Sequence, residues 1–537
     1  MAVARARMML ALRLALAALV LHLVLVLPGH PGALTPGALL LLPLELPLLL
    51  ALLVAGRGAR WLRGLIVAVL MLSVALRLAD LAMVTAFARP FNPVGDLPLA
   101  AAALNLAQGS LGTPMTVLAV LAAVGALIVV AVLLWRATGG WGRLRPRSRL
   151  LPVALTAALA LLVVAQTGAA MGRWRLPADP PGTAFATRHL TERLVLVDRT
   201  LQDLREFRAA AARDPFAGAP DLLQALDRDL LVIFIESYGR ASLDGPLYAD
   251  TTRATLQGAQ TRLADLGLAM ASGWLASPTQ GGQSWLAHAT FANGLWVNDQ
   301  SRYAAVLASG RQTLFHHAGR SGFPTAAVMP QITLDWPESA VMGFDTILAA
   351  QDLGYRGAPF NWVTMPDQYT LSAMDRLLLD PSRDRPAVVQ VALVSSHAPW
   401  VPVPDPLPWE EVGDGSLFTP MALAGDPPEV VWRDHDRVRE QYRKAVAYSL
   451  RTVLDYAARH AGDAPLMIVL GDHQAAGFVA QESRPDVPVH VIGPPGLVAR
   501  LAAQGLTQGL IPAADAPVRP MDQMRDLILS SLTDPAP

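Results

Sequence analysis

Five long apolar stretches fill the first third of this sequence and constrain its fold more than any other feature. They cover residues 9–27, 39–55, 65–88, 115–135 and 151–171. A helix needs about 20 predominantly apolar residues to cross the hydrocarbon core of a bilayer. The sequence therefore predicts an N-terminal transmembrane domain of five helices in residues 1–172.

The arginines that flank these stretches predict their orientation. They gather at the N-terminus and in the second-to-third and fourth-to-fifth connections, as Arg5, Arg7, Arg57, Arg60, Arg63, Arg136, Arg143, Arg145, Arg147 and Arg149. The alternate connections carry only Arg89. The arginine-rich side is expected to be cytoplasmic. An odd number of spans then predicts a multi-pass protein of a bacterial inner membrane whose C-terminal part faces the periplasm.

Three ionisable residues lie deep within the apolar stretches: Glu45, Arg77 and Asp80. Charges at that depth are costly and are usually paired or functional. Two interpretations stay open, a polar pocket that admits a lipid headgroup and a structural ion pair that fixes helix packing.

The rest of the chain has the composition of a soluble domain. Residues 173–228 are rich in Arg, Asp, Pro and Ala and predict a juxtamembrane connector, and residues 229–537 are long enough for a large core. The formal net charge is zero, which gives no basic footprint for nucleic acid. The absence of cysteine excludes disulfides, thiolate nucleophiles and cysteine zinc sites.

Within residues 229–537, apolar runs alternate with helical patterns. The runs predict buried strands at 230–236, 387–394, 465–470 and 487–492. Helical patterns separate them at 286–295, 313–321 and 437–461. Buried strands that alternate with helices indicate an α/β domain with a mostly parallel sheet.

Polar residues follow three of these strands. Glu236 ends the first run, His397 follows the second, and Asp472 and His473 follow the third. Ligands of α/β sheets bind beyond the carboxyl ends of the strands, so these side chains are expected on one rim. Carboxylate and imidazole ligands suit one divalent metal ion, zinc or manganese.

A nucleophile is expected at Ser284, where a Gly-Gly turn leads directly into a helix. Helix amides and the helix dipole favour anions at that position. A metal on the serine oxygen would lower its pKa and activate it. Thr279, in the same loop, is the alternative nucleophile.

Together these motifs resemble the alkaline phosphatase/sulfatase superfamily. The sequences IFIES, GGQSWLAH, SSHAPW and GDH carry the resemblance. The similarity is greatest to the membrane-bound branch, with its lipoteichoic acid synthases, phosphoethanolamine transferases and phosphoglycerol transferases, and it covers most of the chain. It implies a sulfatase-like α/β domain behind five membrane spans.

The resemblance also implies roles for individual residues. Glu236, Asp472 and His473 become metal ligands, and Ser284 becomes the nucleophile and a further metal contact. His397 and His490 become phosphate-binding histidines. Trp336 stands in the loop where the glycerol-phosphate polymerases place substrate contacts, although the basic residues of that loop are missing here. Arg240, beside Glu236, is a further candidate for substrate contact, with a surface salt bridge as the alternative.

The resulting prediction is a metal-dependent transferase that moves a phospho-headgroup, of the phosphoglycerol or phosphoethanolamine type, from a membrane phospholipid to a glycan or lipid acceptor of the cell envelope. The branch usually uses threonine as nucleophile, whereas this chain offers serine. Two other functions stay open: a sulfatase, phosphatase or phosphodiesterase that uses the same site, and a non-catalytic membrane scaffold. Ser284 lacks the following Pro and Arg that sulfatases need to form an aldehyde.

Overall fold

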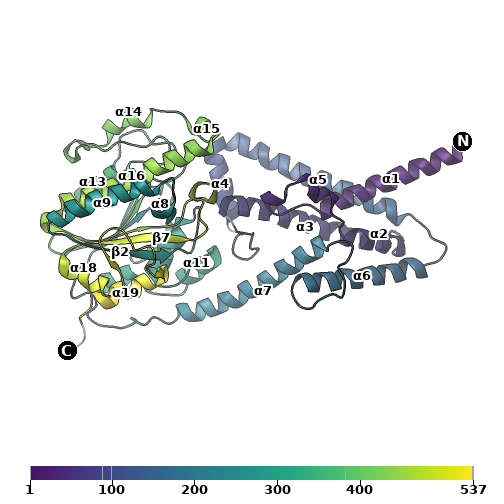
Figure 1. Cartoon of the computed structure of the whole chain (residues 1–537), viewed down its shortest axis with the longest axis horizontal. Coiled ribbons are helices and arrows are strands. Elements are labelled where there is room, and N and C mark those ends of the chain that lie inside the picture. The colour runs from purple at the N-terminus through teal and green to yellow at the C-terminus, as the bar shows by residue number, and fades with distance from the viewer. Residues whose placement is uncertain (1, 88, 98, 381–382, 535–537) are drawn as a thin grey trace. The chain divides into compact units, whose positions relative to one another are not determined.

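A computed structural model describes residues 2–87, 89–97, 99–380 and 383–534, and the chain divides into two compact units, residues 1–203 and 204–537 (Figure 1). The first unit is helical. Its elements are α1 (Ala2–Leu25), α2 (Glu45–Ala55), α3 (Arg60–Phe87), α4 (Leu99–Leu111), α5 (Thr113–Gly142), α6 (Leu150–Ala170) and most of α7 (Phe185–Ala211).

Four helices of the described chain are long and apolar enough to cross a membrane: Ala4–Leu25, Arg60–Phe87, Thr113–Gly142 and Leu150–Ala170. The expected span at 39–55 is not confirmed, because that segment forms a short 3-10 helix, Pro36–Leu40, and then the 11-residue helix α2. Pro43 interrupts the run and pairs instead with Thr183 in a β-bridge. A helix of that length spans about 16 Å, roughly half of a bilayer core. The odd number of spans, on which the periplasmic orientation rested, is therefore not confirmed. Residue 88, the expected end of the third span, lies outside the described part.

The second unit is built on one mixed, mostly parallel sheet in the order β4-β3-β5-β1-β6-β7-β2-β8, with β9 beside β2. Its strands are β1 (Leu230–Ile235), β2 (Ala269–Ala276), β3 (Thr325–Met329), β4 (Thr346–Ala349), β5 (Val388–Leu393), β6 (Leu466–Gly471), β7 (Asp486–Gly493), β8 (Thr507–Gln508) and β9 (Val518–Pro520). The four predicted runs are β1, β5, β6 and β7. The central strands β3, β5, β1 and β6 are parallel, but β7 runs antiparallel to β6.

Helices cover both faces of this sheet, and Figure 1 shows α9, α13 and α16 on one side and α18 and α19 on the other. Alternate side chains of β1 supply the two cores: Leu231, Ile233 and Ile235 pack with α9, α13 and α16, and Leu230, Val232 and Phe234 pack with α10, α12, α18 and α19. The helices are α9 (Ala249–Asp265), α10 (Ser284–Asn293), α12 (Leu314–Arg320), α13 (Asp367–Leu378), α16 (His435–Arg459), α18 (Pro495–Ala502) and α19 (Met524–Ser531). Because both faces of β1 are buried, its sequence is continuously apolar.

Candidate metal centre and active site

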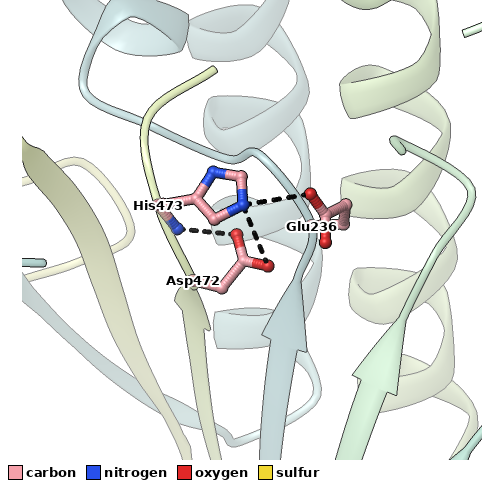
Figure 2. Close-up of side chains that lie close together, drawn as sticks. All are labelled: Glu236, Asp472 and His473. Atoms are coloured by element: carbon pink, nitrogen blue, oxygen red, sulfur yellow. Dashed lines mark hydrogen bonds and ion pairs between the residues drawn. The ribbon is translucent and has the colours of Figure 1, made fainter. Parts of the chain in front are cut away.

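The carboxyl ends of β1 and β6 bring three predicted residues together. Ile235 pairs with Gly471 in the parallel register, so Glu236 and Asp472 leave adjacent strands at the same level. One ligand atom from each of Glu236, Asp472 and His473 lies within 4.8 Å of the others, and all three residues are buried (Figure 2). His473 Nε2 lies 3.2 Å from Glu236 Oε1 and 3.8 Å from Asp472 Oδ2.

Local backbone geometry holds this cluster in place. A Cβ on Gly471 would lie 1.8 Å from the Tyr238 carbonyl oxygen, so only glycine fits beside the turn that follows Glu236. Ser237, within that turn, has a left-handed φ of 57°. Its amide donates to Asp472 Oδ1 at 2.8 Å and its hydroxyl donates to Glu236 Oε1 at 2.9 Å. Ser237, with its strained backbone, thus forms hydrogen bonds to both Glu236 and Asp472.

Burial and close contact shift the pKa values within the cluster. Burial opposes ionisation of Glu236, but His473 and His397 outweigh it and hold the Glu236 pKa well below its usual range. Burial and the charge of Glu236 raise the pKa of Asp472 well above its usual range. Burial lowers the His473 pKa, yet the two carboxylates prevail and raise it to about 9. The two carboxylates therefore stabilise a positive charge on the group beside them, here the His473 imidazole.

The donor set fits a divalent metal ion. Neither Glu236 nor Asp472 forms an ion pair with arginine or lysine in the described part of the chain; their ion pairs are with His473 alone. Two buried carboxylates without a permanent cation are costly unless another positive charge compensates them. Two carboxylates and one imidazole are ligands that zinc and manganese accept.

Ser284 lies beside this cluster. It is the first residue of α10, after three residues with positive φ: Gly281, Gly282 and Gln283. Its Oγ donates to Glu236 Oε2 at 2.9 Å and lies 3.2 Å from His473 Nε2. Thr279 Oγ1 instead donates to the Gly282 carbonyl at 2.6 Å and so holds the loop. The geometry therefore favours Ser284 over Thr279 as nucleophile.

His397 lies on the neighbouring strand end, after β5. It lines a narrow pocket with Trp400, and its charge contributes to the low pKa of Glu236. The preceding residue, Ser396, donates its hydroxyl to the Glu236 carbonyl at 2.6 Å. The structure therefore places His397 near the cluster, as the order of the strands predicts.

The other three predicted substrate contacts have partners elsewhere. His490 lies within β7, opposite Val469 rather than at a strand end, and its Nε2 lies 3.0 Å from the Tyr238 hydroxyl. Burial lowers the His490 pKa to about 4. Trp336 lies against Phe344 at the edge of the core.

Arg240 has a complete set of partners away from the cluster. Its guanidinium donates to Asp244, to Asp486 and to the Ala514 carbonyl, and it lies 4.2 Å over the Trp274 ring. These bonds give Arg240 a structural role in the turn after β1, close to the salt-bridge alternative, although the pair with Asp486 is buried rather than on the surface.

Sequence reasoning missed Asp367, which orients the loop that carries His397. This fully buried carboxylate begins α13 and accepts bonds from the amides of Val394 and Ser395, both at 2.8 Å, and from the Ser449 hydroxyl at 2.6 Å. Its partners are 27 to 82 residues away along the chain, so no local pattern marks it.

One comparison with known proteins, a family profile, covers the part of the chain that contains this site. Residues 228–485 match the sulfatase family profile. No curated protein matches the chain by sequence.

Several solved structures show weak similarity. The lipoteichoic acid synthase LtaP from Listeria monocytogenes is 14% identical over 55% of this chain and 71% of its own, with a TM-score of 0.34. The phosphoglycerol transferase GacH from Streptococcus pyogenes is 11% identical over 62% and 90%, with a TM-score of 0.36. The periplasmic domain of EcEptC from Escherichia coli is 14% identical over 57% and 82%, with a TM-score of 0.34. These similarities are too low to bear on the reaction.

The family match spans the strand ends that carry Glu236, His397, Asp472 and His473, and the start of α10, which carries Ser284. Sulfatase-family enzymes use a metal ion, and the acid-histidine cluster is a group of residues that could hold one. The C-terminal unit thus contains, at residues 228–485, a domain that matches the sulfatase family.

Proposed function

We propose that this chain is a membrane-anchored, metal-dependent transferase. It moves a phospho-headgroup, of the phosphoglycerol or phosphoethanolamine type, from a membrane phospholipid to a glycan or lipid acceptor of the cell envelope. The catalytic domain faces the periplasm of a bacterium, and the helices lie in its inner membrane.

The observation that carries this proposal is the position of Ser284. Its hydroxyl is within hydrogen-bonding distance of both Glu236 and His473 at the start of a helix. A serine that only packed or capped a helix would not need two buried members of an acid-histidine cluster as partners. A hydroxyl in this position can attack a phosphorus atom and be held as an ester.

Glu236, Asp472, His473 and Ser284 would hold the metal ion, zinc or manganese. When bound, the ion supplies Lewis-acid chemistry: it lowers the pKa of the serine hydroxyl and neutralises charge on the phosphate. The residues of the chain orient the nucleophile and the phosphate. Glu236 Oε2 orients the Ser284 hydroxyl, and Ser237 keeps the two acids in register. His397, held by the loop that Asp367 orients, faces the non-bridging oxygens of the phosphate.

The reaction has two displacements. Ser284 Oγ forms a bond to phosphorus while the bond from phosphorus to the diacylglycerol oxygen breaks. The acceptor oxygen then displaces Ser284 from phosphorus, and over the whole cycle the acceptor's hydroxyl proton ends on diacylglycerol. The apolar helices hold the catalytic domain at the membrane that contains the donor, which raises the effective donor concentration.

The test is covalent labelling of the full-length protein in detergent micelles, loaded with zinc or manganese and mixed with phosphatidylglycerol or phosphatidylethanolamine. Intact mass is compared between the parent chain and Ser284→Ala. We expect a metal-dependent mass gain that equals the transferred headgroup and is absent in the variant.

Steady release of free headgroup without any acceptor would instead identify a hydrolase that uses the same residues. Neither an adduct nor turnover of any ester, together with no bound metal, would contradict the proposal and support the non-catalytic scaffold.

A further inference from the structure

A groove with a volume of about 600 Å³ lies in the C-terminal unit beside α16. One wall is apolar and rich in proline, with Val401, Pro402, Pro404 and Pro420. The opposite wall carries polar side chains of α16. The volume is in the range of specific ligand sites, which is about 300–1,000 Å³.

The polar wall is a basic stripe along one helix. Arg437, Lys444 and Arg451 all line the groove, and they are spaced seven residues apart on α16. Seven residues are close to two helical turns, so the three cations face the same side and follow one another at intervals of about 10 Å. A single small anion cannot contact all three, whereas an extended chain with repeated negative charges can.

The cations of this stripe are only partly neutralised. Arg437 pairs with Asp426 at 2.5 Å, and Lys444 lies 3.5 Å from Glu440. Arg451 is exposed and has no hydrogen bond or ion pair with any described residue. Two acids, Asp405 and Asp426, face three cations among the residues that line the groove. Among the lining side chains alone, the groove thus has one more cation than acids.

The groove shares one wall with the narrow pocket beside His397. Val401, Pro402 and Pro404 line both the groove and the narrow pocket that contains His397. A ligand that lies along α16 would thus be separated by only this wall from the histidine expected to contact the transferred phosphate. The segment that forms the shared wall follows His397 directly in the sequence.

We propose that this groove binds the acceptor and that the acceptor is an acidic glycan, a sugar chain that bears carboxylate or phosphate groups. The assignment of acceptor rests on the transferase function proposed above. Proline and valine side chains pack against the apolar faces of sugar rings, and the basic stripe pairs with the acidic substituents. The three cations along the groove disfavour acyl chains, which carry no charge to pair with them.

The chain offers a direct probe of this groove, because Lys444 is its only lysine. The Lys444 side chain is 54% exposed and so is open to an amine-acetylating reagent. The full-length protein in micelles is pulsed with the reagent, and acetylation of the Lys444 peptide is measured by mass spectrometry. The probes are hexagalacturonate, neutral maltohexaose and inorganic phosphate.

Hexagalacturonate is expected to slow acetylation about tenfold at ten times its Kd, since only the free fraction reacts. Arg451→Gln should raise the concentration for half-protection about two- to fivefold, as one exposed charge contact does. Arg459→Gln, the matched control on the same helix outside the groove, should leave it unchanged.

Three outcomes would overturn the proposal: no protection by hexagalacturonate, equal protection by phosphate, or equal protection by maltohexaose. The covalent labelling of the parent chain separates this proposal from the proposed function. Protection by hexagalacturonate in a parent chain that forms no covalent adduct with either phospholipid would keep the glycan site and reject the transferase. An adduct in the parent chain without protection of Lys444 by hexagalacturonate would keep the transferase and reject the glycan site.

Discussion

Each unit of this protein buries carboxylates beside a histidine, but the two sets differ in their other partners. In the N-terminal unit, Asp80 Oδ2 lies 2.7 Å from His189 Nε2 and 3.3 Å from Arg193, and Asp80 Oδ1 accepts from the Phe91 amide. In the C-terminal unit, Glu236 and Asp472 lie near one another and His473, and neither forms an ion pair with an arginine or lysine among the described residues.

This difference separates a cluster whose acids have other partners from a cluster that could hold a metal ion. Asp80 has an arginine and a backbone amide among its partners, and nearby Asp96 accepts two hydrogen bonds from Arg89. Glu45 accepts from the Thr187 amide. These contacts favour the structural interpretation of the charges in the apolar stretches. The Glu236 cluster has more acceptors than cations, and a divalent ion resolves that excess.

Asp472→Asn should have the largest effect on catalysis. The amide oxygen can still accept from the Ser237 and His473 amides, so the fold survives, but one metal ligand loses its charge. We expect loss of the bound metal and a fall in turnover of at least about 10³-fold. Metal content by elemental mass spectrometry and headgroup release measure the two effects. Full metal content in this variant would contradict the assignment of the cluster.

Asp80→Ala tests the other side of the comparison. It leaves the half-buried Arg193 and His189 without the Asp80 carboxylate, although Arg193 keeps its bond to the Phe91 carbonyl, and it should lower the free energy of unfolding by about 3 kcal/mol. Unfolding by sodium dodecyl sulfate in mixed micelles measures it, with the exposed acid in Asp198→Ala as control. The metal content should be unchanged. A loss of metal here would mean that the two clusters are not independent.

Removal of the metal should affect one cluster alone. At a metal concentration of about 100 times Kd, binding adds about 2.7 kcal/mol to the stability of the C-terminal unit, and a chelator removes it. Thermal unfolding with and without chelator should show this shift in the parent chain and in Asp80→Ala. The same shift in Asp472→Asn would show that the ion binds somewhere else.

Thr279→Val should have the smallest effect and completes the comparison of the two candidate nucleophiles. It removes the bond to the Gly282 carbonyl and should cost about 1 kcal/mol of stability. Covalent labelling of the protein by the phospholipid donor should persist. Loss of the label in Thr279→Val, with label retained in Ser284→Ala, would reverse the assignment of the nucleophile.

The sequence by itself determined the features that depend on local pattern. Continuous apolar runs identified β1, β5, β6 and β7, because strands buried on both faces need apolar residues at every position. The order of the strand-end motifs predicted that Glu236, His397, Asp472 and His473 lie at one rim of the sheet. The Gly-Gly turn before a helix placed Ser284.

The tertiary structure decided what depends on distant partners. It limited the candidate membrane helices of the described chain to four, because Pro43 starts a bridge to Thr183 instead of continuing a span. It reversed the direction of β7 and left His490 within the sheet, bonded to Tyr238. It paired Arg240 with Asp244 and Asp486. It also placed Asp367 where it accepts hydrogen bonds from the loop that carries His397. Hydrogen bonds between residues far apart in the chain leave no local periodicity, so only the packed fold reveals them.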